Sequence, residues 1–216
     1  MIDNGSIKYD RVSFKTAIDT AEFSIVFERV NETLNFANGH NHLFTKHDAE
    51  FVQLLNDDAM LEPTYLQEVV AFMDAHPSYA SASGRIFRWA FDRADSATRG
   101  KTDVIDSLGL ERFASGKVAE RFRGVPLVKI SERALMALNM FGVSGCLPMY
   151  RRSAVLTSSP DTTLFDPTFV SYKEDVEIAY RFAAIGMHSA IVQTATAYHR
   201  RTFTRNAHAQ QTAAVQ

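Results

Sequence analysis

The chain has 216 residues, enough for one large domain or two small ones. Its 46% hydrophobic and 22% charged residues are typical of a globular protein, and its net charge of −2 gives no general attraction to nucleic acid or acidic membranes. The single cysteine, Cys146, excludes a disulfide framework and a cysteine metal site. No apolar run approaches the ~20 residues of a membrane span. From the composition and the net charge together, we expect a globular protein without a nucleic-acid partner.

Short strands and turns are expected in the N-terminal part of the chain. Ile2 is expected to close a strand, because the sequence DNGS that follows is typical of a turn. The patterns predict a short helix over Lys8–Asp19 and a strand over Phe23–Phe27, where FSIVF is rich in β-forming residues. Asn35–Asn41 (NFANGHN) is expected to be a loop, either an ordinary turn or one that lies near a ligand.

Three polar residues follow directly after a short apolar stretch, Phe51–Leu55, that is expected to be a strand. They are Asn56, Asp57 and Asp58. A strand would hold these side chains rigidly at the carboxyl edge of a sheet, where open α/β folds bind ligands. Carboxylate oxygens there suit Mg²⁺ or Mn²⁺ bound to nucleotide phosphates, whereas the simpler alternative is a polar turn.

The middle of the chain is expected to continue as an α/β fold. A helix opens near Pro63, carries apolar residues at helical spacing and ends at His76. We then expect strands over Tyr79–Ala82 and Arg85–Phe91, a surface excursion with a hairpin over Phe91–Gly124, and a helix over Ser131–Asn139 with Ser131 as its N-cap. Near Gly145 the small residues permit close approach by a ligand or by backbone, and Cys146 is most simply a small buried side chain.

The strongest helical pattern is Glu174–Ile185, which ends at Gly186. Glu174 and Asp175 lie in its first turn. Acidic residues there complement the helix dipole, typically by ~0.3–1 kcal/mol each, so a structural role is one explanation and a functional role the other.

A last strand is expected over Ser189–Val192, and His199 follows it beside Arg200 and Arg201. A histidine flanked by two arginines just after a strand is a candidate phosphate or metal ligand. The alternatives are a structural histidine and a solvated tail.

Six stretches stand in one order along the chain: IDNGS at 2–6, LNFANGHN at 34–41, LLNDDAMLEPTYL at 54–66, GVSGCLPMYRRSA at 142–154, FDPTFVSYKEDVEIAYRFAAIGM at 165–187 and AYH at 197–199. In this order the chain resembles family-2 glycosyltransferases of the GT-A fold, in particular the rhamnosyltransferase-like branch that builds bacterial surface polysaccharides. The resemblance implies an α/β fold with a Rossmann-like mixed sheet flanked by helices. It would form one domain over residues 1–205, followed by a disordered tail over 206–216.

On the donor side, the resemblance implies roles for five residues. Asp3 resembles the acid that hydrogen-bonds the nucleobase. Asn56, Asp57 and Asp58 resemble the DXD-type motif, with Asp58 as the direct ligand of Mg²⁺ or Mn²⁺ and the other two expected to contact the sugar nucleotide. His199 resembles a histidine that lies by the metal and the diphosphate.

On the acceptor side, Glu174 and Asp175 resemble the family's ED motif, with Asp175 as general base. Gly145 and Cys146 resemble the wall beside the donor sugar and acceptor, and Arg200 would help to bind the diphosphate. Inverting transfer needs such a base, and it needs a cation for the charge on the departing diphosphate. The helix dipole is expected to depress the pKa of Asp175 and to make it a weak base.

The partners implied are a UDP- or dTDP-linked sugar and a saccharide acceptor. The enzyme would be cytoplasmic, at the inner face of the membrane where the acceptor is lipid-linked. Family members begin with a strand, a helix and a second strand before the DNGS turn, so we expect a chain truncated at its N-terminus. A nucleotidyltransferase and a non-catalytic fragment are the rival interpretations.

Overall fold

The computed structural model describes residues 2–4, 19, 21, 23–31, 33–90, 100–136, 139–169 and 172–200. Apart from Asp19, the helix expected over Lys8–Asp19 lies outside the described residues, as do Gly5 and Ser6 of the expected turn, Arg201 and the expected tail at 206–216.

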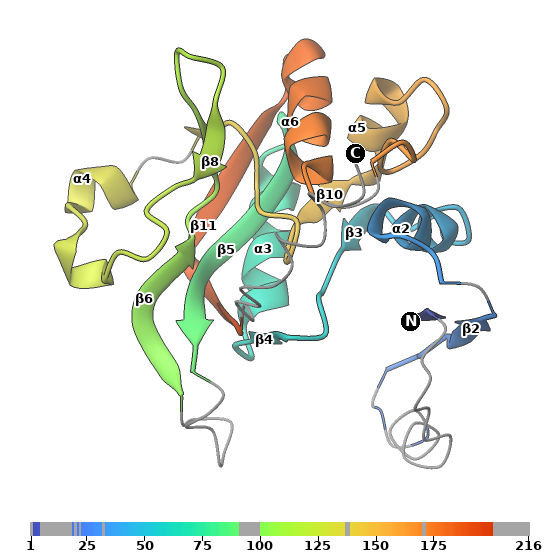
Figure 1. The fold of residues 1–216 in the computed structure, drawn as a ribbon, viewed down its shortest axis with the longest axis horizontal. Helices are drawn as coiled ribbons and strands as arrows, with labels where there is room; N and C mark the ends of the chain where they lie inside the picture. The colour runs from blue at the N-terminus through green and yellow to red at the C-terminus, as the bar shows by residue number, and fades with distance from the viewer. Residues whose placement is uncertain are drawn as a thin grey trace, which may run out of the picture.

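A mixed sheet forms the centre of the molecule (Figure 1). Its strand order is β3 (Phe51–Gln53), β10 (Met149–Arg151), β5 (Tyr79–Trp89), β11 (His188–His199) and β4 (Ala59–Leu61), with β6 (Lys101–Ser107) added to β5 and β9 (Asn139–Met140) added to β11. Strands β5 and β11 run parallel, and the other pairs are antiparallel. The carboxyl ends of the two long strands therefore lie at the same edge, and β4 starts there because Ala59 pairs with His199.

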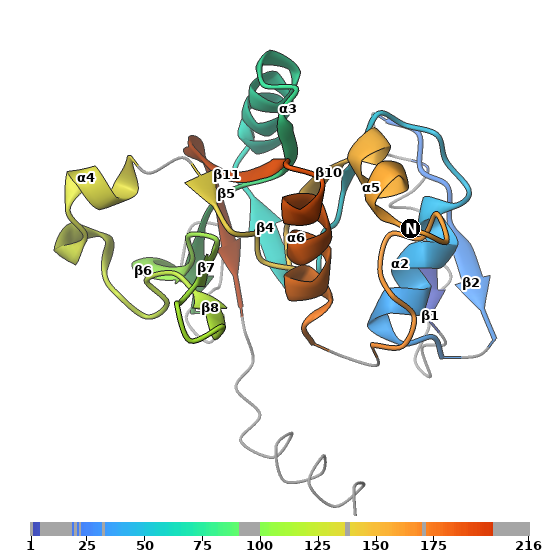
Figure 2. The same cartoon turned by 90° about the horizontal axis from the view of Figure 1, so that it is seen from above.

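Helices cover both faces of this sheet (Figure 2). Helix α3 (Tyr65–Ala75) covers one face, whereas α6 (Glu174–Ala184) covers the other, with α5 (Arg152–Ser158) and α2 (Phe36–Phe44) to one side. Each face has its own hydrophobic core. Within the described parts of the chain, no helix combines the length and hydrophobicity needed to cross a membrane.

Helix α3 packs on the sheet through the tyrosine at its first position. Tyr65 is fully buried, and its hydroxyl accepts a hydrogen bond from the backbone N–H of Gly84 over 3.0 Å. Gly84 lies within β5, which is continuous where two strands were expected. A Cβ on Gly84 would lie 2.5 Å from Cε2 of Tyr65 and 2.6 Å from the carbonyl oxygen of Ala195, so only glycine fits between α3 and β11.

Two local predictions in the N-terminal part are wrong. Asn35–Asn41 is the start of α2 and not a loop, because the Asn35 side chain caps the helix by accepting from the N–H of Asn38 over 2.8 Å. Phe23–Phe27 is irregular, and the strand lies at β2 (Glu28–Val30), which pairs in parallel with β1 (Ile2–Asn4). The FSIVF pattern identified β-forming residues, but whether they form a strand depends on a neighbouring strand that the pattern does not reveal.

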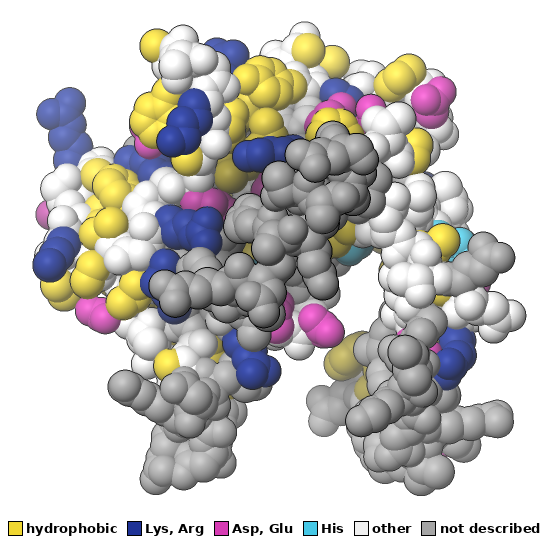
Figure 3. Space-filling model, in the orientation of Figure 1, with side chains coloured by type: hydrophobic (Ala, Val, Ile, Leu, Met, Phe, Trp, Pro, Cys, Tyr) yellow, Lys and Arg dark blue, Asp and Glu magenta, His cyan; other side chains and the backbone are white. Residues whose placement is uncertain are grey.

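The predicted surface excursion over Phe91–Gly124 is wrong for β6, which joins the central sheet beside β5 and buries Ile105 and Asp106, whereas the predicted hairpin is confirmed. After β6 the chain forms a hairpin of β7 (Leu110–Arg112) and β8 (Val118–Glu120), then a 3₁₀ turn over Leu127–Lys129 and the short helix α4 (Glu132–Leu135). Ser131 caps α4 as predicted. On the face seen in Figure 3, basic side chains are interspersed with acidic and apolar ones.

Candidate functional site

The polar triplet forms a tight turn between β3 and β4. The carbonyl oxygen of Asn56 accepts a hydrogen bond from the N–H of Ala59 over 3.2 Å, which closes the turn around Asp57 and Asp58. The N–H of Asn56 donates to the carbonyl oxygen of Cys146 over 3.1 Å, so a hydrogen bond connects the turn to the loop before β10. The triplet is therefore a polar turn at the edge of the sheet, and its role in metal binding stays a prediction.

Asp58 and His199 form a carboxylate–imidazole pair at this edge. Nε2 of His199 lies 3.1 Å from Oδ1 of Asp58. The N–H of Arg200 donates to the carbonyl oxygen of Asp58 over 2.9 Å, which continues the pairing of β11 with β4. The His199 side chain is 8% exposed and the Asp58 side chain 29% exposed, so the imidazole is fixed while the carboxylate still reaches solvent.

A second carboxylate, which sequence reasoning missed, lies on the other side of the imidazole. Oδ2 of Asp106 is 2.8 Å from Nδ1 of His199, and the Asp106 side chain is fully buried. The sequence contained a clue to this residue, because Asp106 follows Val104 and Ile105 in an expected strand. An aspartate in such an apolar stretch is rarely buried without a partner.

The pair of Asp58 and His199 fits a Mg²⁺- or Mn²⁺-type ion. Two neighbouring ligands ~2.1 Å from one octahedral ion lie ~3 Å apart, and the observed separation is 3.1 Å. Among the described residues no group of three potential ligands is brought together. Mg²⁺ is commonly bound by one or two protein carboxylates together with substrate phosphates, so a two-ligand site matches a metal that arrives with a nucleotide.

Asp175 lies at the start of α6 and is held by two backbone N–H groups. Gly145 donates to its Oδ2 over 3.2 Å and Val176 to its Oδ1 over 2.9 Å. Burial raises the pKa of Asp175, although these two hydrogen bonds and the charge of Lys173 oppose the shift. The expectation of a depressed pKa is wrong, because burial of the carboxylate outweighs the hydrogen bonds at the start of the helix.

Its neighbour Glu174 is buried, and burial followed by the charge of Asp175 raises its pKa. Within the described structure, Oε1 of Glu174 has no hydrogen-bond partner. The two residues before it, Tyr172 and Lys173, have φ values of 69° and 79°, a left-handed backbone that costs ~1–3 kcal/mol in non-glycine residues. Such strain is concentrated at functional sites.

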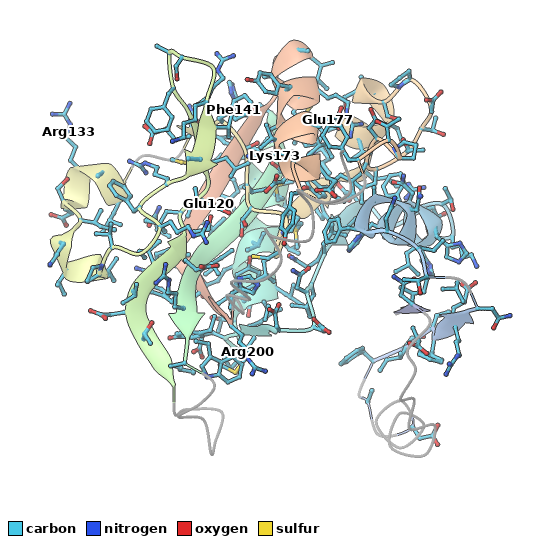
Figure 4. All side chains as sticks on the ribbon, in the orientation of Figure 1. Glu120, Arg133, Phe141, Lys173, Glu177 and Arg200 are labelled. Atoms are coloured by element: carbon cyan, nitrogen blue, oxygen red, sulfur yellow. The ribbon has the colours of Figure 1, made fainter. Side chains whose placement is uncertain are left out.

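Two chains of contacts join the pair of Asp58 and His199 to Asp175. In the first, Cys146 accepts from Asn56 while its neighbour Gly145 donates to Asp175. In the second, Glu120 accepts hydrogen bonds from the hydroxyls of Ser107 and Ser144 (Figure 4). Ser107 follows Asp106 in the chain, and Ser144 precedes Gly145. That Asp58 and Asp175 face a single cleft stays a prediction.

The remaining predicted site residues have other surroundings. Asp3 is buried on β1 and pairs with Arg29 over 3.3 Å. Strand β1 lies beside α2, to one side of the central sheet (Figure 2). The Cys146 side chain belongs to the core under α3, so only its backbone faces the site. Asp57 is exposed in the turn, and Arg200 is exposed beside Asp58 (Figure 4).

Comparison with known proteins identifies the fold. No protein-family model matches the sequence, and no curated protein matches it. The chain superimposes on GalNAc-T7, solved with UDP, GalNAc and Mn²⁺, with a TM-score of 0.68 and 14% identity, over 94% of this chain and 37% of that one. It also superimposes on the Pyrobaculum calidifontis mannosyltransferase PcManGT, solved with GDP-Man and Mn²⁺. The TM-score is 0.62 and the identity 13%, over 97% of this chain and 49% of that one.

These similarities confirm the predicted fold class: the chain has the GT-A glycosyltransferase fold, an α/β mixed sheet with flanking helices. The chain spans less than half the length of either protein.

Proposed function

We propose that this chain carries a metal-dependent glycosyltransferase site that moves a sugar from a nucleoside-diphosphate sugar to a saccharide acceptor. The observation that supports this most directly is the 3.1 Å pair of Asp58 and His199 at the carboxyl edge of a GT-A sheet. Both similar structures contain Mn²⁺ together with UDP or GDP-Man.

On the donor side, Asp58 and His199 are the residues that would hold Mg²⁺ or Mn²⁺. When bound, the metal supplies positive charge for the departing diphosphate. Arg200, exposed beside Asp58, adds a second positive charge, and Asn56 and Asp57 line the turn that meets the nucleotide.

On the acceptor side, Asp175 is the general base. Its carboxylate takes the proton of the attacking hydroxyl while the bond from the anomeric carbon to the acceptor oxygen forms and the bond to the diphosphate oxygen breaks, which inverts the anomeric centre. Its raised pKa makes it a stronger base than an exposed aspartate. The N–H of Gly145 fixes the orientation of Oδ2.

The finer assignment follows the sequence resemblance. The donor is a UDP- or dTDP-linked sugar, the enzyme belongs to family 2 with rhamnosyltransferase-like specificity, and the acceptor is a growing bacterial surface polysaccharide. If that acceptor is lipid-linked, the enzyme works in the cytoplasm at the inner face of the membrane. Asp3 then contacts the nucleobase after exchanging its partner Arg29.

The test is to incubate the chain with a panel of UDP-, dTDP- and GDP-sugars, Mn²⁺ and oligosaccharide acceptors, and to measure the nucleotide released. We expect nucleoside diphosphate to be released, to disappear with EDTA or in Asp58→Asn, and to persist in the exposed control Asp74→Asn. Pyrophosphate would indicate a nucleotidyltransferase, which does not need Asp175. Neither product, together with no Mn²⁺-dependent stabilisation by any of the nucleotides, would indicate a non-catalytic fragment.

A further inference from the structure

The contact between Asp106 and His199 has a chemical consequence for the ring. An ionised carboxylate can only accept hydrogen bonds. With Oδ2 of Asp106 lying 2.8 Å from Nδ1, a proton on that nitrogen lets the ring donate to the carboxylate. The opposite nitrogen, Nε2, lies 3.1 Å from Oδ1 of Asp58, so it donates to that carboxylate in a doubly protonated ring and is free to bind a metal ion in a neutral ring protonated on Nδ1.

The backbone of β6 is shaped to make this contact. Ile86 of β5 pairs with Ser107, whereas the next residue, Phe87, pairs with Ile105, so the register shifts by one residue and Asp106 lies in a β-bulge. Bulges redirect a side chain and occur next to functional sites. His199 lies on β11, on the far side of β5, 93 residues along the chain. The bulge therefore lets a residue of β6 reach across the intervening strand.

We infer that Asp106 is a positioning residue, whose carboxylate keeps the proton of His199 on Nδ1 and thereby presents Nε2 to the metal ion. This inference rests on the proposed function, because it assigns Asp106 to the same metal site. Metal-binding histidines commonly donate their second N–H to a carboxylate, which fixes the ring and makes Nε2 a better ligand. Loss of such a partner typically weakens metal binding ~10–100-fold.

A purely structural role makes a different prediction. A buried aspartate that only tied β6 to β11 would affect stability, but its loss would not weaken metal binding in a folded protein. Substitution by Asn keeps the shape and can turn an N–H₂ towards Nδ1. The proton of the neutral ring should then move to Nε2, the nitrogen that must be free to bind metal.

The test has two measurements on the full chain. In the first, the ¹⁵N spectrum of histidine-labelled, metal-free protein, recorded at a pH where the His199 ring is neutral, reports the tautomer, with the His199 signals assigned from a His199→Gln sample. We expect the wild type to carry its proton on Nδ1 and Asp106→Asn to shift it towards Nε2. An unprotonated Nδ1 in the wild type would overturn the inference, and that spectrum is informative even if Asp106→Asn does not fold.

In the second measurement, Mn²⁺ binding is followed by electron paramagnetic resonance with Mn²⁺ alone and with UDP or GDP. We expect Asp106→Asn to bind Mn²⁺ ~10–100-fold more weakly, and Asp103→Asn, an exposed residue of the same strand, to bind like the wild type. If a folded Asp106→Asn protein binds Mn²⁺ with the affinity of the wild type, the role of Asp106 is overturned and the proposed function is not. Absence of Mn²⁺ binding in the wild type would overturn the proposed function as well.

Discussion

The backbone N–H of Gly145 donates a hydrogen bond to Oδ2 of Asp175 over 3.2 Å. This contact joins the loop before β10 to the first turn of α6, and it holds the carboxylate in one orientation. A carboxylate that is both oriented and partly removed from water is suited to accept a proton from a bound hydroxyl group.

Asp175→Asn should abolish sugar transfer and leave nucleotide binding nearly intact. Loss of a general base typically lowers the rate ~10²–10⁴-fold, while Asn still accepts a hydrogen bond from Gly145. Product formation and calorimetric binding of UDP or GDP with Mn²⁺ check this pair of effects. If transfer and nucleotide binding are lost together, Asp175 has a structural role instead.

The pH dependence of transfer should reflect the raised pKa of Asp175. The base must be ionised, so kcat/KM should fall on the acid side at a pH above the ordinary aspartate value of 3.8. The charge of Lys173 lowers this pKa, so Lys173→Gln should move the acid limb to still higher pH. A pH–rate profile of both proteins tests the direction, and an unchanged or downward shift in Lys173→Gln would contradict it.

Glu174→Gln should stabilise the protein at neutral pH. Burial raises the pKa of Glu174 in the folded state, so its contribution to stability is complete below the unfolded pKa and is lost as pH rises through the folded pKa. The stability gained from the neutral Gln side chain should therefore grow from acid to neutral pH, because Gln carries no charge that burial disfavours. Thermal unfolding at several pH values measures this difference, and a loss of stability at neutral pH would refute it.

Two glycines should respond in opposite directions to alanine. Gly84→Ala places a Cβ 2.5 Å from the ring of Tyr65 and 2.6 Å from the carbonyl of Ala195, and should cost ~2 kcal/mol or more. Gly39→Ala lies in α2 with no atom within 4 Å of the new Cβ, and should add ~0.5–1 kcal/mol. Denaturant unfolding of both variants checks the contrast, and equal effects would show that α3 does not pack on β5 as described.

Local sequence patterns predicted the features that depend on neighbours in the chain. The polar turn at Asn56–Asp58 follows from acids after an apolar strand, and α6 follows from its apolar spacing and Gly186, whose φ of 74° ends the helix. Asn35 shows the limit of such patterns, because an asparagine near glycine suits a turn as well as a helix cap.

Features that depend on distant residues were not predictable from one sequence. Burial raises the pKa of Asp175, and no local rule weighs the burial produced by tertiary packing against the hydrogen bonds at the start of the helix. Asp106 reaches His199 only because β6, β5 and β11 are neighbours in the sheet, and because a bulge redirects it.

The most direct test of the metal site is the anomalous scattering of Mn²⁺ in crystals of this chain grown with UDP or GDP. We expect a peak ~2–2.3 Å from Oδ1 of Asp58 and Nε2 of His199, with the phosphates of the nucleotide on its open side. A bound nucleotide whose Mn²⁺ peak lies away from both side chains, or crystals that bind neither metal nor nucleotide, would contradict the proposed site.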